Sequence, residues 1–141
     1  MTLPILSIDR SRAYPPRVTA FTRRFWDALA EGRLETTRCN GCDRLSFPPK
    51  PICPHCWSSD IGWTALSGRG RLYSRTVVHA APAVFQPEAP YGVGVIDLDE
   101  GLRIATRVIG DPPPELDATV ELVVLSYSDG PLYAARAMDG P

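Results

Sequence analysis

Cys39-Asn-Gly-Cys42 and Cys53-Pro-His-Cys56 are separated by ten residues and contain all four cysteines of this 141-residue chain. Two thiolates at positions i and i+3 can ligate one ion, so two such motifs complete a tetrahedral shell of four sulfur atoms. A shell of four protein ligands leaves no position for water or substrate, as in structural zinc sites. The pattern therefore predicts one structural zinc ion held by Cys39, Cys42, Cys53 and Cys56.

A disulfide and a thiol oxidoreductase motif are the alternatives to zinc. The N-terminus has no basic segment followed by an apolar one, so the sequence predicts a cytoplasmic, reducing location, where paired cysteines more often bind metal. A redox motif places its first cysteine at the start of a helix, where the pKa of the thiol falls. Residues 57–60 show no helical period, which favours zinc. We expect His55 to be a solvated residue without a ligand role.

The overall charge shows that this chain is not one of the strongly basic proteins that bind nucleic acid through their net charge. The 15 basic and 16 acidic residues give a formal net charge of −1, which provides no general attraction for nucleic acid or for an anionic membrane. No run reaches the roughly 18 apolar residues of a membrane-spanning helix. We therefore expect no membrane association, and we regard nucleic acid as an unlikely partner.

The N-terminal third is predicted to form an arm and then a helix. Three prolines indicate that residues 1–17 are an extended arm, which we expect to become ordered only against a partner. A helical period indicates a helix over residues 18–31, ended by Gly32. One face of this helix is large and aromatic; it contains Phe21, Phe25, Trp26 and Leu29. This face either packs on its own domain or docks on another subunit.

From residue 68 onward, alternating apolar and polar residues indicate β-structure. The predicted strands are residues 69–78, 91–98, 102–109, 120–125 and 132–137. Five strands with a longer loop after the third fit a small OB-fold barrel. Two short strands, 34–38 and 61–66, flank the cysteine motifs. The predicted organisation is mainly β: an arm and helix (1–33), a zinc ribbon (34–66) and a five-stranded barrel (67–141).

The first barrel strand carries a basic stripe. Alternation places Arg69, Arg71, Tyr73 and Arg75 on one face and the apolar Leu72 on the other. The stripe is a solvated charged surface, a phosphate site, or a single-stranded nucleic-acid site with Tyr73 stacked on bases. With one aromatic residue and no excess of positive charge, nucleic acid is the weakest of the three.

No catalytic constellation is visible in the sequence. The two histidines are His55 and His79, and neither is accompanied by a recognisable nucleophile and orienting acid. Asp97, Asp99 and Glu100 belong to a predicted hairpin turn, where acidic residues are common. We therefore predict no catalytic residue in this chain.

A series of short motifs follows one order along the chain. They are Phe25-Trp26-Asp-Ala-Leu-Ala-Glu-Gly32, Cys39-x-x-Cys42, Phe47-Pro48-Pro49-Lys50, Cys53-Pro54-x-Cys56, Ser67-Gly68-x-Gly70, Pro90-Tyr91 and Leu98-x-Glu100-Gly101. In this order, from about residue 19 to residue 125, the chain resembles the acyl-CoA-associated zinc-ribbon/OB-fold family, catalogued as a domain of unknown function. It departs from the family pattern at Lys50, where arginine is common, and at Asp117, where glycine is usual.

The resemblance implies a rubredoxin-like zinc ribbon, an OB-fold barrel and a role as a non-catalytic accessory subunit. The implied partner is a thiolase-superfamily enzyme acting on acyl-CoA, with an aldolase that cleaves a steroid side-chain acyl-CoA as the best candidate. Alternative partners are an acyltransferase, a hydroxymethylglutaryl-CoA synthase with its thiolase, or an enoyl-CoA hydratase. An alternative of another class is a single-stranded nucleic-acid-binding module.

The resemblance also gives the surface residues candidate roles. It implies a hetero-oligomer, such as a dimer of heterodimers, that shares acyl-CoA as a ligand. The candidate acyl-CoA-binding residues are Arg69, Arg71, Tyr73 and Arg75. The candidate partner-binding residues are Phe21, Phe25, Trp26, Phe47, Pro48 and Pro49.

Overall fold

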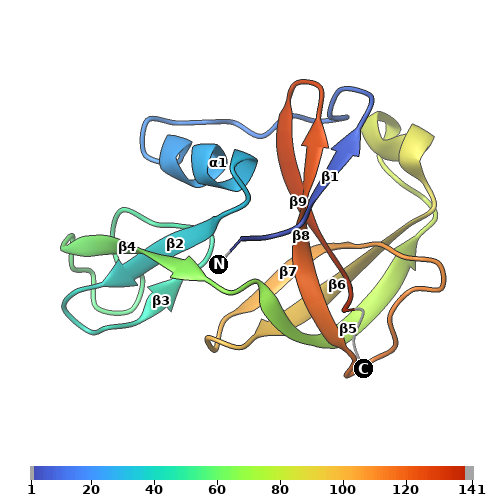
Figure 1. Cartoon of the computed structure of the whole chain (residues 1–141). Coiled ribbons are helices and arrows are strands. Elements are labelled where there is room, and N and C mark those ends of the chain that lie inside the picture. The colour runs from blue at the N-terminus through green and yellow to red at the C-terminus, as the bar shows by residue number, and fades with distance from the viewer. Residues whose placement is uncertain (1, 139–141) are drawn as a thin grey trace.

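A six-stranded sheet and a three-stranded sheet make up the computed structural model, which describes residues 2–138 (Figure 1). The elements are β1 (Ile5–Ile8), α1 (Arg23–Ala30), β2 (Leu34–Cys39), β3 (Leu45–Ser46), β4 (Ile61–Leu66), β5 (Arg69–Val78), the 3₁₀ helix η1 (Ala83–Glu88), β6 (Tyr91–Leu98), β7 (Arg103–Val108), β8 (Thr119–Tyr127) and β9 (Gly130–Ala137). The prediction of a mainly β chain with one N-terminal α-helix is confirmed.

The larger sheet closes into a barrel. Its strand order is β1-β8-β5-β6-β7-β9, and β8 also pairs with β9. The strands β8, β5, β6, β7 and β9 therefore form a closed ring. The interior is filled by side chains that alternate with more exposed ones along β5 and β6, whereas β8 is buried on both faces over residues 122–125. The most deeply buried of them include Leu72, Ile96, Val120, Leu122 and Val124. The predicted five-stranded barrel is therefore present, and β1 is a sixth strand on its outer side.

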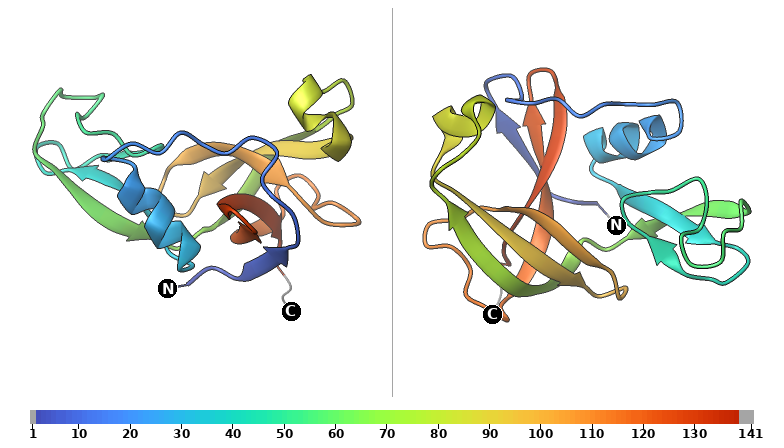
Figure 2. Two further views of the ribbon diagram at one scale, coloured as in Figure 1. Left: turned by 90° about the horizontal axis from the view of Figure 1, so that it is seen from above. Right: turned by 180° about the vertical axis from the view of Figure 1, so that it is seen from behind.

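The smaller sheet has the order β3-β2-β4 and forms the ribbon at one end of the molecule, while η1 lies at the far end of the barrel (Figure 2). β4 continues into β5 through two residues, Ser67 and Gly68. Glu100, in the β6–β7 turn, accepts a 2.7 Å hydrogen bond from the N–H of Ser67. This carboxylate therefore ties the barrel to the connection with the ribbon, a role that the sequence did not reveal.

The helix is shorter than predicted. It begins at Arg23 rather than at residue 18, and a turn from Thr19 to Thr22 precedes it: the N–H of Thr19 donates to Thr22 Oγ1 (2.8 Å) and the N–H of Thr22 to Thr19 Oγ1 (3.1 Å). The predicted end at Gly32 is correct, since its φ is +85°, as expected for a glycine helix cap. No helix in the described part of the chain is long and apolar enough to cross a membrane.

The N-terminal arm packs on the chain's own barrel, which corrects the expectation that it becomes ordered only against a partner. β5 pairs with β8 only at residues 119–121, so the later half of β8 has a free edge. β1 occupies this edge in parallel, from Ile5 opposite Val124 to Ile8 opposite Tyr127. The backbone N–H of Arg12 then donates to Asp129 (2.9 Å).

A β-bulge changes the predicted faces of β5. Leu72 pairs with Ile96, whereas Ser74 pairs with Val95, so Tyr73 is an extra residue. Residues directly opposite in a sheet share a face, and a bulge therefore reverses the alternation that follows it. Arg75 lies opposite Gly94 and shares the inner face with Leu72. It is exposed in the second half of the strand but does not continue the stripe, which corrects the simple alternation expected for residues 69–78.

Candidate functional site

The four cysteines converge at the end of the ribbon. Their sulfur atoms all lie within 4.8 Å of one another, and the Cys39–Cys56 and Cys42–Cys53 distances are 3.5 and 3.6 Å. Zinc–sulfur bonds of 2.3 Å in a tetrahedron separate the sulfur atoms by about 3.8 Å. A disulfide would need about 2.05 Å. The arrangement therefore fits one tetrahedral metal ion and not two disulfides.

The two Cys-x-x-Cys turns are built in the same way. The N–H of Cys39 donates to the carbonyl of Arg44, and the N–H of Cys53 donates to that of Ser58, both at 2.9 Å. The residue after each second cysteine, Asp43 or Trp57, has a φ of +65° or +66°. Neither turn opens a helix, so the geometry expected of a redox motif is absent from both. Two equivalent turns that open no helix support the prediction that the four cysteines bind one metal ion.

The thiols cannot all ionise without a cation. The N–H of Cys42 donates toward the Cys39 sulfur and lowers the pKa of that thiol to about 6. For Cys56, the N–H of Ser58 lowers the pKa, but the Cys39 sulfur, burial and the other two thiols outweigh it and raise the pKa to about 12. A divalent cation would stabilise all four thiolates. The site thus has the donor set, spacing and charge requirement of structural zinc.

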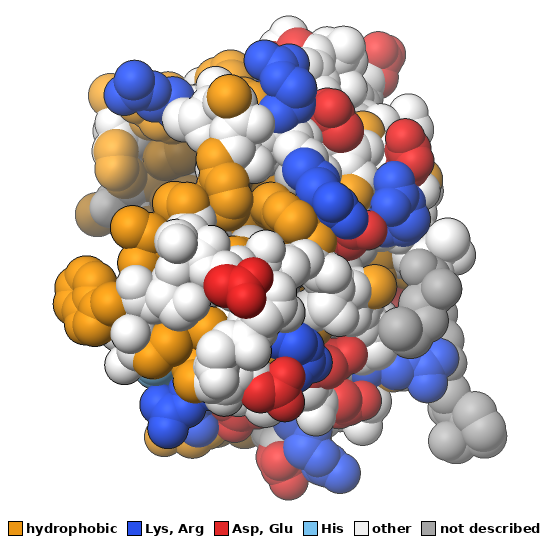
Figure 3. Space-filling model, turned by 90° about the vertical axis from the view of Figure 1, so that its left-hand side faces the viewer, with side chains coloured by type: hydrophobic (Ala, Val, Ile, Leu, Met, Phe, Trp, Pro, Cys, Tyr) orange, Lys and Arg blue, Asp and Glu red, His pale blue; other side chains and the backbone are white. Residues whose placement is uncertain are grey.

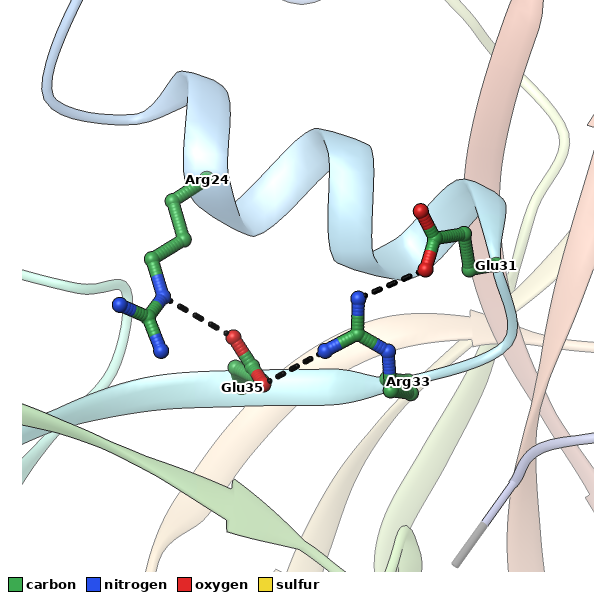
Figure 4. A network of polar contacts seen from close by, with 4 residues as sticks. All are labelled: Arg24, Glu31, Arg33 and Glu35. Carbon is green, nitrogen blue, oxygen red and sulfur yellow. Dashed lines mark hydrogen bonds and ion pairs between the residues drawn. The ribbon is translucent and has the colours of Figure 1, made fainter.

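A charged network fixes α1 against the ribbon (Figure 4). Glu35 on β2 is largely buried and accepts hydrogen bonds from Arg24 of α1 (3.2 Å) and from Arg33 (3.0 Å). Arg33 also donates to Glu31 (2.8 Å), and these carboxylates raise the pKa of its guanidinium. The network therefore sets the position of the helix relative to the metal-binding turns.

Replacing Glu35 with alanine is expected to destabilise the chain by about 1–2 kcal/mol, because hydrogen bonds from charged groups to a mostly buried carboxylate are lost. Denaturant unfolding followed by circular dichroism measures this change. Glu31→Ala is the matched control: Glu31 is exposed and shares Arg33, so we expect little effect. Equal losses for both variants would contradict a special role for Glu35.

The aromatic face of α1 packs on its own chain, which decides between the two alternatives for it. Phe25 is 4% exposed and makes edge-to-face contacts with Trp26, Phe47 and Tyr133. Phe21 packs against Trp63, with ring centroids 5.4 Å apart. The candidate partner contacts Phe25 and Pro49 are buried and cannot meet another protein in this structure, whereas Pro48 is exposed.

The tip of the ribbon presents apolar side chains, of which Pro48 is a predicted partner contact and Trp57 and Ile52 are not. Trp57 is 80% exposed, and Ile52 and Pro48 are exposed beside the cysteine turns. Hydrophobic side chains also gather across the face formed by the ribbon and α1 (Figure 3). The positive φ of Trp57 is shared with Asp43, the equivalent residue of the other cysteine turn, and therefore belongs to the turn geometry. The feature that the sequence did not reveal is the exposure of Trp57, which cannot be read from a motif.

Three of the predicted stripe residues remain together on the outer face. Arg69, Arg71 and Tyr73 are exposed on β5, and Arg103 on β7 places its guanidinium 3.8 Å from the centre of the Tyr73 ring. Arg103 is paired with Asp97 (2.6 Å), which lowers the pKa of that carboxyl through the hydrogen bond. Tyr73 is therefore already stacked on one face, which leaves less of it for a nucleic-acid base.

Comparison with known proteins places these features in a family. The model of the ChsH2 rubredoxin-like zinc ribbon domain matches residues 26–62, and that of the ChsH2 C-terminal OB-fold domain matches residues 63–125. A solved structure described as an Ltp2-ChsH2(DUF35) aldolase contains a chain 32% identical to this one; the match covers 87% of this chain and 98% of that chain, with a TM-score of 0.73. The chain belongs to the DUF35 family. Its ribbon is thus of the rubredoxin-like zinc type, as predicted.

Relatives of this DUF35 chain carry different names. A benzoylsuccinyl-CoA thiolase subunit BbsA from Thauera aromatica is 37% identical over 118 residues, which is 81% of this chain and 81% of the relative. A probable enoyl-CoA hydratase alpha subunit from Thermomonospora curvata is 37% identical over 102 residues, or 71% of this chain. The match spans only 31% of that relative's length.

Proposed function

We propose that this DUF35 chain is a non-catalytic accessory subunit of a thiolase-superfamily enzyme that acts on acyl-CoA, with a steroid side-chain aldolase as the best candidate. The observation that carries the proposal is the likeness of 87% of this chain to 98% of a chain in the structure described as an Ltp2-ChsH2(DUF35) aldolase. The resemblance to a thiolase subunit over 81% of its length supports the same class of partner.

The chemistry of the side chains supports an accessory role. All four thiols of the sequence belong to the closed metal site, where they cannot act as nucleophiles. His55 lies against Arg44, with 3.3 Å between Nδ1 and the guanidinium nitrogen, at the exposed end of the ribbon. We infer that the partner supplies the nucleophile and base, and that the two chains work together in the cytoplasm, where thiols stay reduced.

The exposed basic surface on the outer face of the barrel is our candidate for contact with coenzyme A. It consists of Arg69, Arg71 and Tyr73 on β5 and Arg103 on β7. Arg69 forms no ion pair among residues 2–138, and Arg71 is paired only with exposed Asp117 at 3.5 Å. Guanidinium groups match phosphate oxygens in a bidentate way. Arg75, on the other face of the strand, is the weakest of the original four candidates. Acyl-CoA would then be shared between this chain and its partner.

The exposed ribbon tip is our candidate for the partner contact. Exposed tryptophans are strongly enriched among the residues that dominate protein interfaces. Trp57, Ile52 and Pro48 lie on a tip held rigid by the metal-binding turns. Phe21, Trp26 and Phe47 are half-buried against aromatic residues of this chain and remain weaker candidates for the partner contact.

Co-expression with a thiolase-like protein encoded nearby tests the proposal. We expect the two chains to copurify as a hetero-oligomer whose mass shows whether heterodimers pair further. Trp57→Ala is expected to weaken the complex by at least tenfold, since interface tryptophans are worth about 2 kcal/mol or more. Leu116→Ala, at an exposed apolar residue on the barrel, is the control. Monomeric behaviour beside every such candidate would refute the proposal.

A further inference from the structure

A groove of about 500 Å³ lies on the barrel surface away from the ribbon tip. It is lined by the N-terminal arm, Trp26 of α1, η1, β7 and the β8–β9 hairpin, which come from distant parts of the sequence. Its walls are mainly apolar; they include Leu6, Ile8, Leu125, Tyr127 and Leu132. Ligand sites for small molecules have volumes of roughly 300–1,000 Å³ and mostly apolar walls with a few polar groups. The groove has this size and character.

The polar side of the groove is held rigidly in place. Glu88 of η1 is only 8% exposed and forms ion pairs with Arg10 of the arm and Arg107 of β7, both at 2.9 Å. The guanidinium of Arg107 lies 3.7 Å from the centre of the Tyr91 ring. Arg10 is 53% exposed, so it retains donors for another group. Two arginines and one glutamate leave this side of the groove with one net positive charge.

A hydroxyl group on β7 faces the barrel interior rather than the groove. The Oγ1 atom of Thr106 is buried and makes no hydrogen bond within the described part of the chain. Thr106 lies between the buried Ile104 and Val108 and opposite Gly94, so its side chain faces the barrel interior. Leaving such a group unsatisfied costs about 1–3 kcal/mol, but the atom is not accessible from the groove and cannot bind a ligand there. The groove thus combines apolar walls with a positive side.

We propose that this groove binds a small amphipathic molecule with a hydrocarbon body and one carbonyl-type oxygen. The body lies against the apolar walls, and the oxygen accepts hydrogen bonds from the half-exposed Arg10. A free carboxylate and a thioester carbonyl both provide this chemistry. The inference does not rest on the proposed function, because a carboxylate could bind this chain without any partner. Binding of the thioester would connect the groove to acyl-CoA chemistry.

Calorimetric titration of the full, zinc-loaded chain tests the proposal with two probes, decanoate and the N-acetylcysteamine thioester of decanoic acid. Ala105 is an exposed β7 residue in the lining, so Ala105→Trp would fill the groove without disturbing the core. We expect this variant to lose at least tenfold in affinity for the probe that binds. Ala65→Trp, at an exposed strand alanine of the ribbon, is the control and should bind as the unmodified chain does.

Two further variants locate the ligand oxygen. Arg10→Gln should weaken carboxylate binding by about threefold to tenfold, because a hydrogen bond is lost, and should weaken thioester binding less, which separates the two sources. Thr106→Val, on the inner face of β7, should bind both probes as the unmodified chain does and should raise the melting temperature, because a buried unsatisfied hydroxyl is removed. No saturable binding of either probe, unchanged affinity in Ala105→Trp, or unchanged carboxylate affinity in Arg10→Gln would overturn the proposal.

Discussion

Cys39→Ser is expected to lose the zinc ion and unfold the ribbon. Cys39 is one of four ligands and is buried at the end of β2, and metal binding in zinc-finger peptides contributes about 10–16 kcal/mol that is coupled to folding. A ribbon of this size has little core of its own to replace that contribution. Metal analysis should fall from one zinc per chain to well below one, and the ribbon amides should lose their protection from hydrogen exchange.

His55→Ala is the matched control for the metal site. His55 lies between two ligands but is exposed, so this variant should keep one zinc per chain and a protected ribbon. Acid should release the metal from the unmodified chain, because protons compete with zinc for the four thiolates. If all four thiols of the native chain react freely without release of metal, the zinc assignment is wrong.

Gly70→Ala is expected to destabilise the barrel by about 3 kcal/mol or more. A Cβ atom at Gly70 would lie 2.2 Å from the carbonyl oxygen of Asp97 on β6. Because that atom belongs to the backbone of a paired strand, β5 and β6 would have to separate beside the Ser67 junction. Denaturant unfolding at neutral pH measures the loss.

Gly62→Ala is the control for this substitution. Gly62 also lies in a strand, but its added Cβ would meet only the Asn40 side chain at 3.6 Å, an ordinary contact. We expect a change of less than about 1 kcal/mol, within the range of strand propensities. A similar cost at both glycines would show that the close approach of β5 and β6 is not what requires Gly70.

The features that could be predicted from the sequence are those governed by local patterns. The spacing of the cysteines predicts a closed metal site, and apolar alternation predicts the barrel strands to within a few residues at their ends. Gly32 predicts the end of α1 because few residues other than glycine readily adopt its positive φ. These predictions depend on neighbours within a few positions in the chain.

The features that were missed depend on long-range pairing. The free edge of β8 orders the arm, but β8 lies more than 100 residues from β1. The bulge at Tyr73 depends on how β5 meets β6, so strict alternation misplaced Arg75. The groove is formed by five segments, and its ion pairs join Arg10 to Glu88 and Glu88 to Arg107. No periodic signal in any one segment predicts these contacts.

A turnover assay with three arms tests the central claim most directly. Acyl-CoA substrate is incubated with this chain alone, with the thiolase-like partner alone, and with the reconstituted complex. The accessory-subunit account predicts no turnover by this chain, weak or no turnover by the partner, and full activity only in the complex. Turnover by the purified chain alone, or full activity of the partner without it, would contradict the account.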